Sequence, residues 1–170
     1  MATSFLPKFP TNIFLVLVVA TAMYAAKATN LGNSNAMTIP VAGIAGKAWT
    51  YTQFGTIYVV DNNITETPDP TSPIVGQLQG LYVIAALDGL DSYVTTSIMF
   101  TNKQYNRSTI QLQGTRFIKQ PVGEDREVAV VGGTGKFRFA RGNATAETYS
   151  LDVTTQYTVS NAMSRCNFPS

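Results

Sequence analysis

The chain has 170 residues, of which 12 are basic, 10 are acidic, one is cysteine and none is histidine. The lack of histidine excludes Ser-His and Cys-His nucleophilic centres and histidine metal sites, and a single cysteine cannot form an intramolecular disulfide. The length suits one domain, whose stability must come from its hydrophobic core.

Residues 1–28 have the features of a secretory signal peptide. Lys8 is the only charged residue before an apolar run at residues 13–26, and Ala26-Lys27-Ala28 fits a small-x-small cleavage site. The run is too short to cross a bilayer comfortably, so we expect no membrane span in the mature chain. Cleavage removes two of the twelve basic residues and leaves ten against ten acidic. A neutral chain of this kind is not expected to bind nucleic acid.

The rest of the chain predicts an all-β fold. Residues 29–46 indicate an extended N-terminal segment, residues 47–160 the folded domain, and residues 161–170 a C-terminal tail. Within the domain, short strand-like runs are separated by turn residues, and no run has the apolar spacing of a helix. The predicted strands are Trp49–Asp61, Val75–Ala86, Tyr93–Thr101, Thr109–Gln113, Glu127–Val131, Lys136–Arg141, Ala144–Asp152 and Gln156–Ser160.

Three N-glycosylation sequons agree with secretion. They begin at Asn63, Asn106 and Asn143, each beside a predicted turn or strand end. Chance occurrence competes with glycosylation at every single site, since the chain is rich in Asn and Thr. Asn63 is the preferred site, because the residues that follow it predict an exposed loop.

The stretch from Val128 to Gly142 predicts one hairpin around a glycine turn. Its second strand would place Phe137, Phe139 and Arg141 on one face. The glycines do not match a phosphate-binding loop, because that motif needs a hydroxyl residue after Lys136.

Several predicted strands are apolar on both faces, as in Ile57–Val60 and Leu81–Ala86. Both faces then need cover, which a barrel provides when its interior holds an apolar ligand and its outside packs on identical subunits. A sandwich is the competing architecture, and the pattern alone separates the two poorly.

Two polar side chains are candidates for a pocket. Tyr82 shares its face with Ile84, and Arg141 shares its predicted face with two phenylalanines. A phenol and a guanidinium in an apolar barrel could hydrogen-bond the oxygens of an aromatic ligand. The residues alone favour the competing interpretation, a core tyrosine and an ion-paired rim arginine, because buried polar groups are usually just satisfied.

Three segments resemble the plant dirigent protein family. They are VVGGTGKFRFARG at residues 130–142, FGTIYVVDNNITE at residues 54–66 and VGQLQGLYV at residues 75–83, in the family's order and at its spacing. The resemblance covers about residues 35–159. It implies an antiparallel eight-stranded β-barrel of the dirigent and allene-oxide-cyclase type, assembled as a homodimer or homotrimer.

The resemblance also implies a function. Dirigent proteins bind monolignol radicals, such as those of coniferyl alcohol, that a separate laccase or peroxidase produces, and they make the coupling to lignans stereoselective. This implies a secreted, apoplastic protein that needs no cofactor and is not an enzyme in the strict sense. Two alternatives are a ring-closing or dehydrating enzyme for isoflavonoid-type substrates and a non-catalytic cell-wall or defence-related binding protein.

By the same resemblance, Tyr82 matches the tyrosine of the family's QG-x-Y segment and Arg141 the arginine of its ARG segment. Ile84 stands where lignan-forming members often have a second tyrosine, and Lys136 where they often have aspartate. The implied pocket comprises Tyr82, Lys136, Phe137, Phe139 and Arg141. The family's first strand has no counterpart after residue 28, so we expect a barrel that lacks it.

Overall fold

The computed structural model describes residues 12–22, 38–67, 71–117, 126–152 and 157–167, and the side chains of residues 38–67, 71–115 and 127–146. These residues form nine β-strands and one short 3-10 helix, η1. The elements are β1 (Asn12–Ala22), β2 (Thr38–Ala42), β3 (Ile57–Thr65), β4 (Ile74–Ile84), β5 (Asp91–Phe100), β6 (Thr109–Phe117), β7 (Arg126–Thr134), η1 (Gly135–Phe137), β8 (Arg141–Asp152) and β9 (Tyr157–Asn167).

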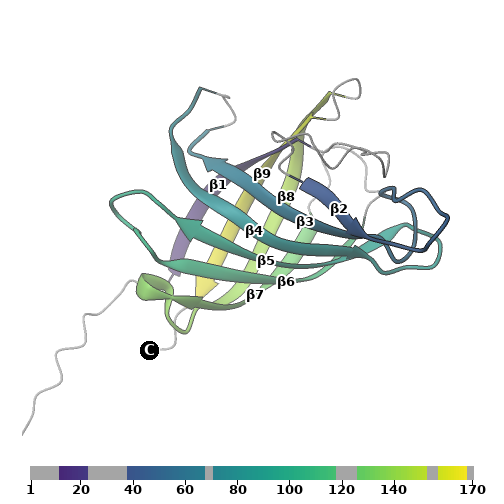
Figure 1. Ribbon diagram of the computed structural model, residues 1–170. Coiled ribbons are helices and arrows are strands. Elements are labelled where there is room, and N and C mark those ends of the chain that lie inside the picture. Colours follow the sequence, from purple (N-terminus) through teal and green to yellow (C-terminus); the bar gives the residue numbers. More distant parts are fainter. Residues whose placement is uncertain (1–11, 23–37, 68–70, 118–125, 153–156, 168–170) are drawn as a thin grey trace, which may run out of the picture.

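All the strands belong to one antiparallel sheet, in the order β1-β9-β8-β7-β6-β5-β4-β3-β2. From β3 to β9 each strand pairs with the next one along the chain, and the sheet curves strongly, with β4, β5 and β6 in front of β1, β8 and β9 (Figure 1). The prediction of an antiparallel all-β fold is confirmed. The described strands number nine where the sequence predicts eight, because two strands precede Ile57 and one predicted strand does not form.

Strand β1 lies inside the segment predicted to be a signal peptide. Its 11 residues pair with β9 along their whole length, and Val18 and Val19 also pair with β3. The sheet of the full chain therefore has a strand ahead of β2, since an apolar run rich in Val and Leu suits a paired strand. The expectation that no first strand follows residue 28 concerns residues 23–37 and lies outside the described residues. Cleavage after residue 28 stays a prediction. At the other terminus, β9 continues to Asn167, through most of the segment assigned to a tail.

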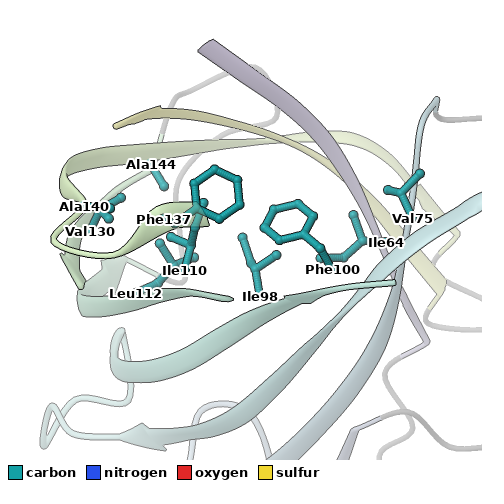
Figure 2. Close-up of a cluster of buried hydrophobic side chains, with 10 residues drawn as sticks. All are labelled: Ile64, Val75, Ile98, Phe100, Ile110, Leu112, Val130, Phe137, Ala140 and Ala144. Atoms are coloured by element: carbon teal, nitrogen blue, oxygen red, sulfur yellow. The ribbon is translucent and has the colours of Figure 1, made fainter. Parts of the chain in front are cut away.

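Alternation along the strands separates an inner from an outer face. On β3, Tyr58, Val60, Asn62 and Ile64 are buried, as period two requires, whereas the residues between them are exposed or half-buried. Ten buried residues form the core, and the rings of Phe100 and Phe137 lie side by side within it (Figure 2). The core residues are Ile64, Val75, Ile98, Phe100, Ile110, Leu112, Val130, Phe137, Ala140 and Ala144.

The predicted strand Lys136–Arg141 does not form. After β7 the chain turns through η1, where Gly135 and Phe139 adopt φ angles of 61° and 66°, and β8 begins only at Arg141. The turn packs tightly, because a Cβ at Gly133 would lie 2.3 Å from the carbonyl oxygen of Phe137. Backbone in the left-handed region cannot keep strand alternation, so Phe137 is buried while Phe139 is 67% exposed.

Candidate functional site

Three tyrosines stack at one end of the inner face, and we call them the tyrosine stack. Tyr58 of β3 and Tyr82 of β4 are register partners whose ring centroids lie 4.6 Å apart, with planes inclined by 12°. Tyr51 lies against Tyr58 with centroids 4.8 Å apart and planes inclined by 11°. Tyr58 is buried, but Tyr51 and Tyr82 are only half-buried. Part of an aromatic surface therefore stays accessible to another planar ring.

The loop at residues 43–56 brings Tyr51 to the stack. The Tyr58 hydroxyl donates to the carbonyl oxygen of Trp49 at 3.4 Å, and Ile84 of β4 binds the loop's end through two backbone hydrogen bonds of 2.9 Å. Gly89, with φ of 73°, lies against the loop so closely that a Cβ there would be 1.9 Å from the carbonyl oxygen of Thr52. The loop is thus held against the turn between β4 and β5.

Burial changes the acid–base chemistry of the stack. Desolvation raises the pKa of Tyr51 from 10.0 to about 12, and its hydrogen bond with Tyr82 offsets part of that rise. Desolvation also raises the pKa of Tyr58, and repulsion from the Tyr51 phenolate adds to it. Both phenols are therefore neutral at physiological pH and can donate hydrogen bonds.

These shifts predict alkaline instability. The folded chain keeps the Tyr51 proton up to a pKa of about 12, whereas an unperturbed tyrosine, as in the unfolded chain, has a pKa of 10.0. The stability is therefore full below pH 10 and decreases as the pH rises through 12. We expect the urea concentration at the unfolding midpoint to fall between pH 10 and pH 12. In Tyr51→Phe the midpoint should fall less steeply with pH. A variant with the wild-type slope would show that Tyr51 does not titrate in this way.

Among the side chains that the structure describes, three buried threonine and asparagine oxygens on or beside the inner face lack a hydrogen-bond partner. They are Thr38 Oγ1, Thr56 Oγ1 and Asn62 Oδ1, and each residue is at most 1% exposed. An unsatisfied buried polar group costs about 1–3 kcal/mol, so each one calls for an explanation.

At the other end of the sheet, aromatic rings of the core pack against η1. Phe137 lies 5.0 Å from Phe100 and 5.1 Å from Tyr105, measured between ring centroids. Helix η1 and the loop that follows β2 lie at opposite ends of the sheet (Figure 1). The accessible aromatic surface is therefore at the tyrosine stack, away from Phe137.

A family model for dirigent-like proteins matches residues 20–165. The chain belongs to this family. Pterocarpan synthase 1 of Glycine max is 41% identical to this dirigent-like chain over 110 residues, which cover 64% of this chain and 58% of that protein. Dirigent protein 1 of Arabidopsis thaliana is 40% identical over 110 residues, covering 63% and 59%. The chain thus matches about three fifths of the length of these curated relatives.

A solved structure of a pterocarpan synthase dirigent protein has the same fold. It matches 94% of this chain and 97% of its own, with a TM-score of 0.74 and 27% sequence identity. The described part of the dirigent-like chain contains no helix with the length and hydrophobicity of a membrane span.

The structure does not gather the five pocket residues that the dirigent resemblance implies. Tyr82 lies on the inner face in the tyrosine stack, and Phe137 lies in the core. Lys136, Phe139 and Arg141 are exposed. Their part in ligand binding remains a prediction.

Arg141 illustrates why the shared-face expectation is wrong. Its Nη1 donates to the carbonyl oxygen of Ala140 at 2.9 Å, and it lies 3.6 Å from where a Cβ at Gly132 would be. The guanidinium therefore lies over β7 and not beside Phe137, because the residues between them form a turn.

Sequence reasoning misses Tyr51, Tyr58 and Asn62. Strand alternation from Ile57 to Ile64 places Tyr58 and Asn62 on one face, and that signal was available in the sequence. Tyr51 belongs to an irregular loop, so no local pattern indicates where its ring lies.

The three sequons occupy different surroundings. Asn106 is exposed in the turn between β5 and β6. Asn63 is half-buried within β3, and Asn143 of β8 donates through Nδ2 to Glu127 Oε2 at 3.0 Å. Glycosylation at all three stays a prediction, and the exposed turn offers the best access at Asn106.

Proposed function

We propose that this dirigent-like chain binds phenolic ligands on its inner face and makes the coupling of monolignol phenoxy radicals stereoselective. The tyrosine stack carries the proposal, because it combines half-buried aromatic rings with neutral phenol hydroxyls. Stacking orients a planar ring, and a hydroxyl fixes its rotation.

In this proposal a separate laccase or peroxidase removes one electron and one proton from each phenol. Two radicals then combine, a carbon–carbon bond forms, and the protein is neither oxidised nor reduced. Holding the two rings in one arrangement excludes the other encounters, so one enantiomer dominates. Intramolecular attack by a hydroxyl traps the coupled quinone methides, and a phenol hydroxyl such as that of Tyr82 can hydrogen-bond the oxygen that gains the proton.

The second candidate is ring closure of an isoflavonoid-type substrate in the same site. The similarity to proteins named pterocarpan synthase favours it, both in sequence and in structure. Such a reaction needs no oxidant, because substrate and product have the same redox state apart from the loss of water.

One paired assay separates the candidates. The chain is incubated with coniferyl alcohol and laccase, and separately with an isoflavanol and no oxidase, and the products are resolved by chiral chromatography. An enantiomeric excess that rises with protein concentration in the first arm supports directed coupling. Turnover in the second arm alone supports ring closure. A folded chain that is inert in both arms would favour the third alternative, a non-catalytic cell-wall or defence-related binding protein.

We also propose that the sheet closes into a barrel. Pairing of β1 with β9 on one side and with β3 on the other supports closure. Secretion to the apoplast is a separate proposal, supported by the apolar N-terminal run and the sequons. Cleavage after residue 28 would remove β1, so closure through β1 is proposed for the uncleaved chain.

Association into a homodimer or homotrimer is proposed from the outer face. Ile39, Val59 and Leu81 are successive register partners on β2, β3 and β4, and they are 37%, 38% and 41% exposed. Such an apolar row on an outer face is typical of an interface.

Leu81→Lys is therefore expected to convert the oligomer to monomer, because it would bury a charge at one end of the row. Light scattering after size-exclusion chromatography measures the mass. Leu87→Lys is the matched control, since Leu87 is 84% exposed in the turn after β4. A monomeric wild-type chain, or equal behaviour of the two variants, would refute this interface.

A further inference from the structure

We propose that Asn62 and Thr38 together bind a hydroxyl group at the far end of the ligand from its stacked ring. This inference rests on the proposed function and adds two binding residues to it. Both residues are 1% exposed, and neither Asn62 Oδ1 nor Thr38 Oγ1 has a hydrogen-bond partner.

The register places the two side chains together. Thr38 of β2 is the partner of Val60, and Asn62 lies two residues further along β3. Cross-strand partners and residues two apart share a face, so Thr38 and Asn62 are diagonal neighbours about 7–8 Å apart between Cα atoms. One small group between them can reach both.

Other side-chain oxygens on β3 do have hydrogen-bond partners. On the outer face, Asp61 Oδ1 accepts a hydrogen bond from Gln79 Nε2 at 3.2 Å. At the strand's end, the Thr65 hydroxyl donates to the carbonyl oxygen of Thr67 at 2.8 Å. The oxygens without a partner, Thr38 Oγ1 and Asn62 Oδ1, therefore lie on the inner face, where a ligand would lie.

The two atoms select a hydroxyl over other groups. Asn62 Oδ1 only accepts, so its partner must donate, and the Thr38 hydroxyl can both donate and accept. A ligand hydroxyl donates to Asn62 and accepts from Thr38 at the same time. A ketone or ether cannot donate, and an ammonium would be costly to bury without a counter-charge.

The spacing fits an aryl alcohol with a short side chain. Val60, opposite Thr38, lies two residues from Tyr58, and Asn62 lies four residues from it. At roughly 3.3 Å per residue the hydroxyl site is ~7–13 Å from the stack. A ring held at the tyrosine stack can therefore extend a terminal alcohol to the two side chains.

Binding of two probes tests the inference. Trp49 is the only tryptophan of the chain, and its carbonyl accepts a hydrogen bond from Tyr58, so its fluorescence reports on the stack. The probes are coniferyl alcohol and the analogue in which a methyl group replaces the terminal CH2OH. We expect the wild-type chain to bind the alcohol about tenfold more tightly, the value of one good hydrogen-bonded group. In Asn62→Leu the ratio should fall to about one, whereas Asn63→Ala, next to it on the outer face, should keep the wild-type ratio.

Thermal unfolding distinguishes a binding role of Asn62 from a structural role, because only the structural role predicts a lower melting temperature for Asn62→Leu. Replacing an unsatisfied buried amide by an apolar side chain of similar volume should leave the free chain as stable or more stable. If Asn62 were a structural residue, Asn62→Leu would lower the melting temperature. Thr38→Val provides the second variant, and it decides the question if Asn62→Leu does not fold.

The outcomes separate this inference from the function on which it rests. If neither probe binds the wild-type chain, the proposed function fails. If both probes bind equally well, the function stands and the hydroxyl site is refuted. Weaker binding of the alcohol in either variant, at unchanged or raised stability, supports the site.

Discussion

Phe137→Ala should destabilise the fold by about 3–5 kcal/mol, the usual cost of removing a buried phenylalanine. Phe137 is fully buried, and its ring packs on those of Phe100 and Tyr105 where η1 covers the core. A loss of this size is comparable to the whole stability of many single domains, so much of the variant is expected to be unfolded. Urea unfolding followed by circular dichroism measures the effect.

Phe139→Ala is the matched control, two residues away. Its side chain is 67% exposed, so we expect a change within about 0.5 kcal/mol. The predicted hairpin places both phenylalanines on one face and would give two similar losses. If both variants were destabilised equally, the result would support the predicted strand at Lys136–Arg141 and contradict the turn at η1.

Removal of residues 1–28 should have the second large effect. A chain that begins at Thr29 lacks β1, and β9 then loses a partner over 11 residues. A long unpaired edge invites association with other chains. We expect this chain to unfold at lower urea concentration than the full chain and to aggregate. Equal stability and the same mass in solution as the full chain would show that β1 is dispensable.

The register of β1 can be tested separately. Ile13 is the partner of Cys166, the only cysteine, and cross-strand Cα distances of about 4.5–5.5 Å suit a disulfide. Ile13→Cys should therefore form an intramolecular disulfide in the full chain. Leu15→Cys, whose partner is Ser164, should not. Crosslinking by both variants, or by neither, would contradict the register.

Strands with local signals could be predicted from the sequence. β4 and β5 begin within two residues of the predicted starts, because alternation and turn residues bound them. The prediction of a strand at Lys136–Arg141 is wrong, because the left-handed backbone at Phe139 depends on the packing of the turn and not on local propensity. β1 was missed because an apolar run fits a signal peptide and a strand equally well.

The site was predictable only in part. Tyr82 was found through its motif, and its place on the inner face follows from alternation along β4. Its neighbour Tyr51 could not be found, because its position depends on a loop held by contacts with Ile84 and Gly89, far along the chain. Asn62 resembled an ordinary polar strand residue, and only its burial without a partner marks it.

The most direct test of the tyrosine stack as the centre of function is chiral chromatography of the products of coniferyl alcohol and laccase. It compares the wild-type chain with Tyr82→Phe and with Tyr93→Phe, whose ring lies on the outer face with its hydroxyl bonded to Gln113. We predict an enantiomeric excess with the wild-type chain and with Tyr93→Phe, and a marked loss of it with Tyr82→Phe. A racemic product in every case, or an undiminished excess with Tyr82→Phe, would contradict the account.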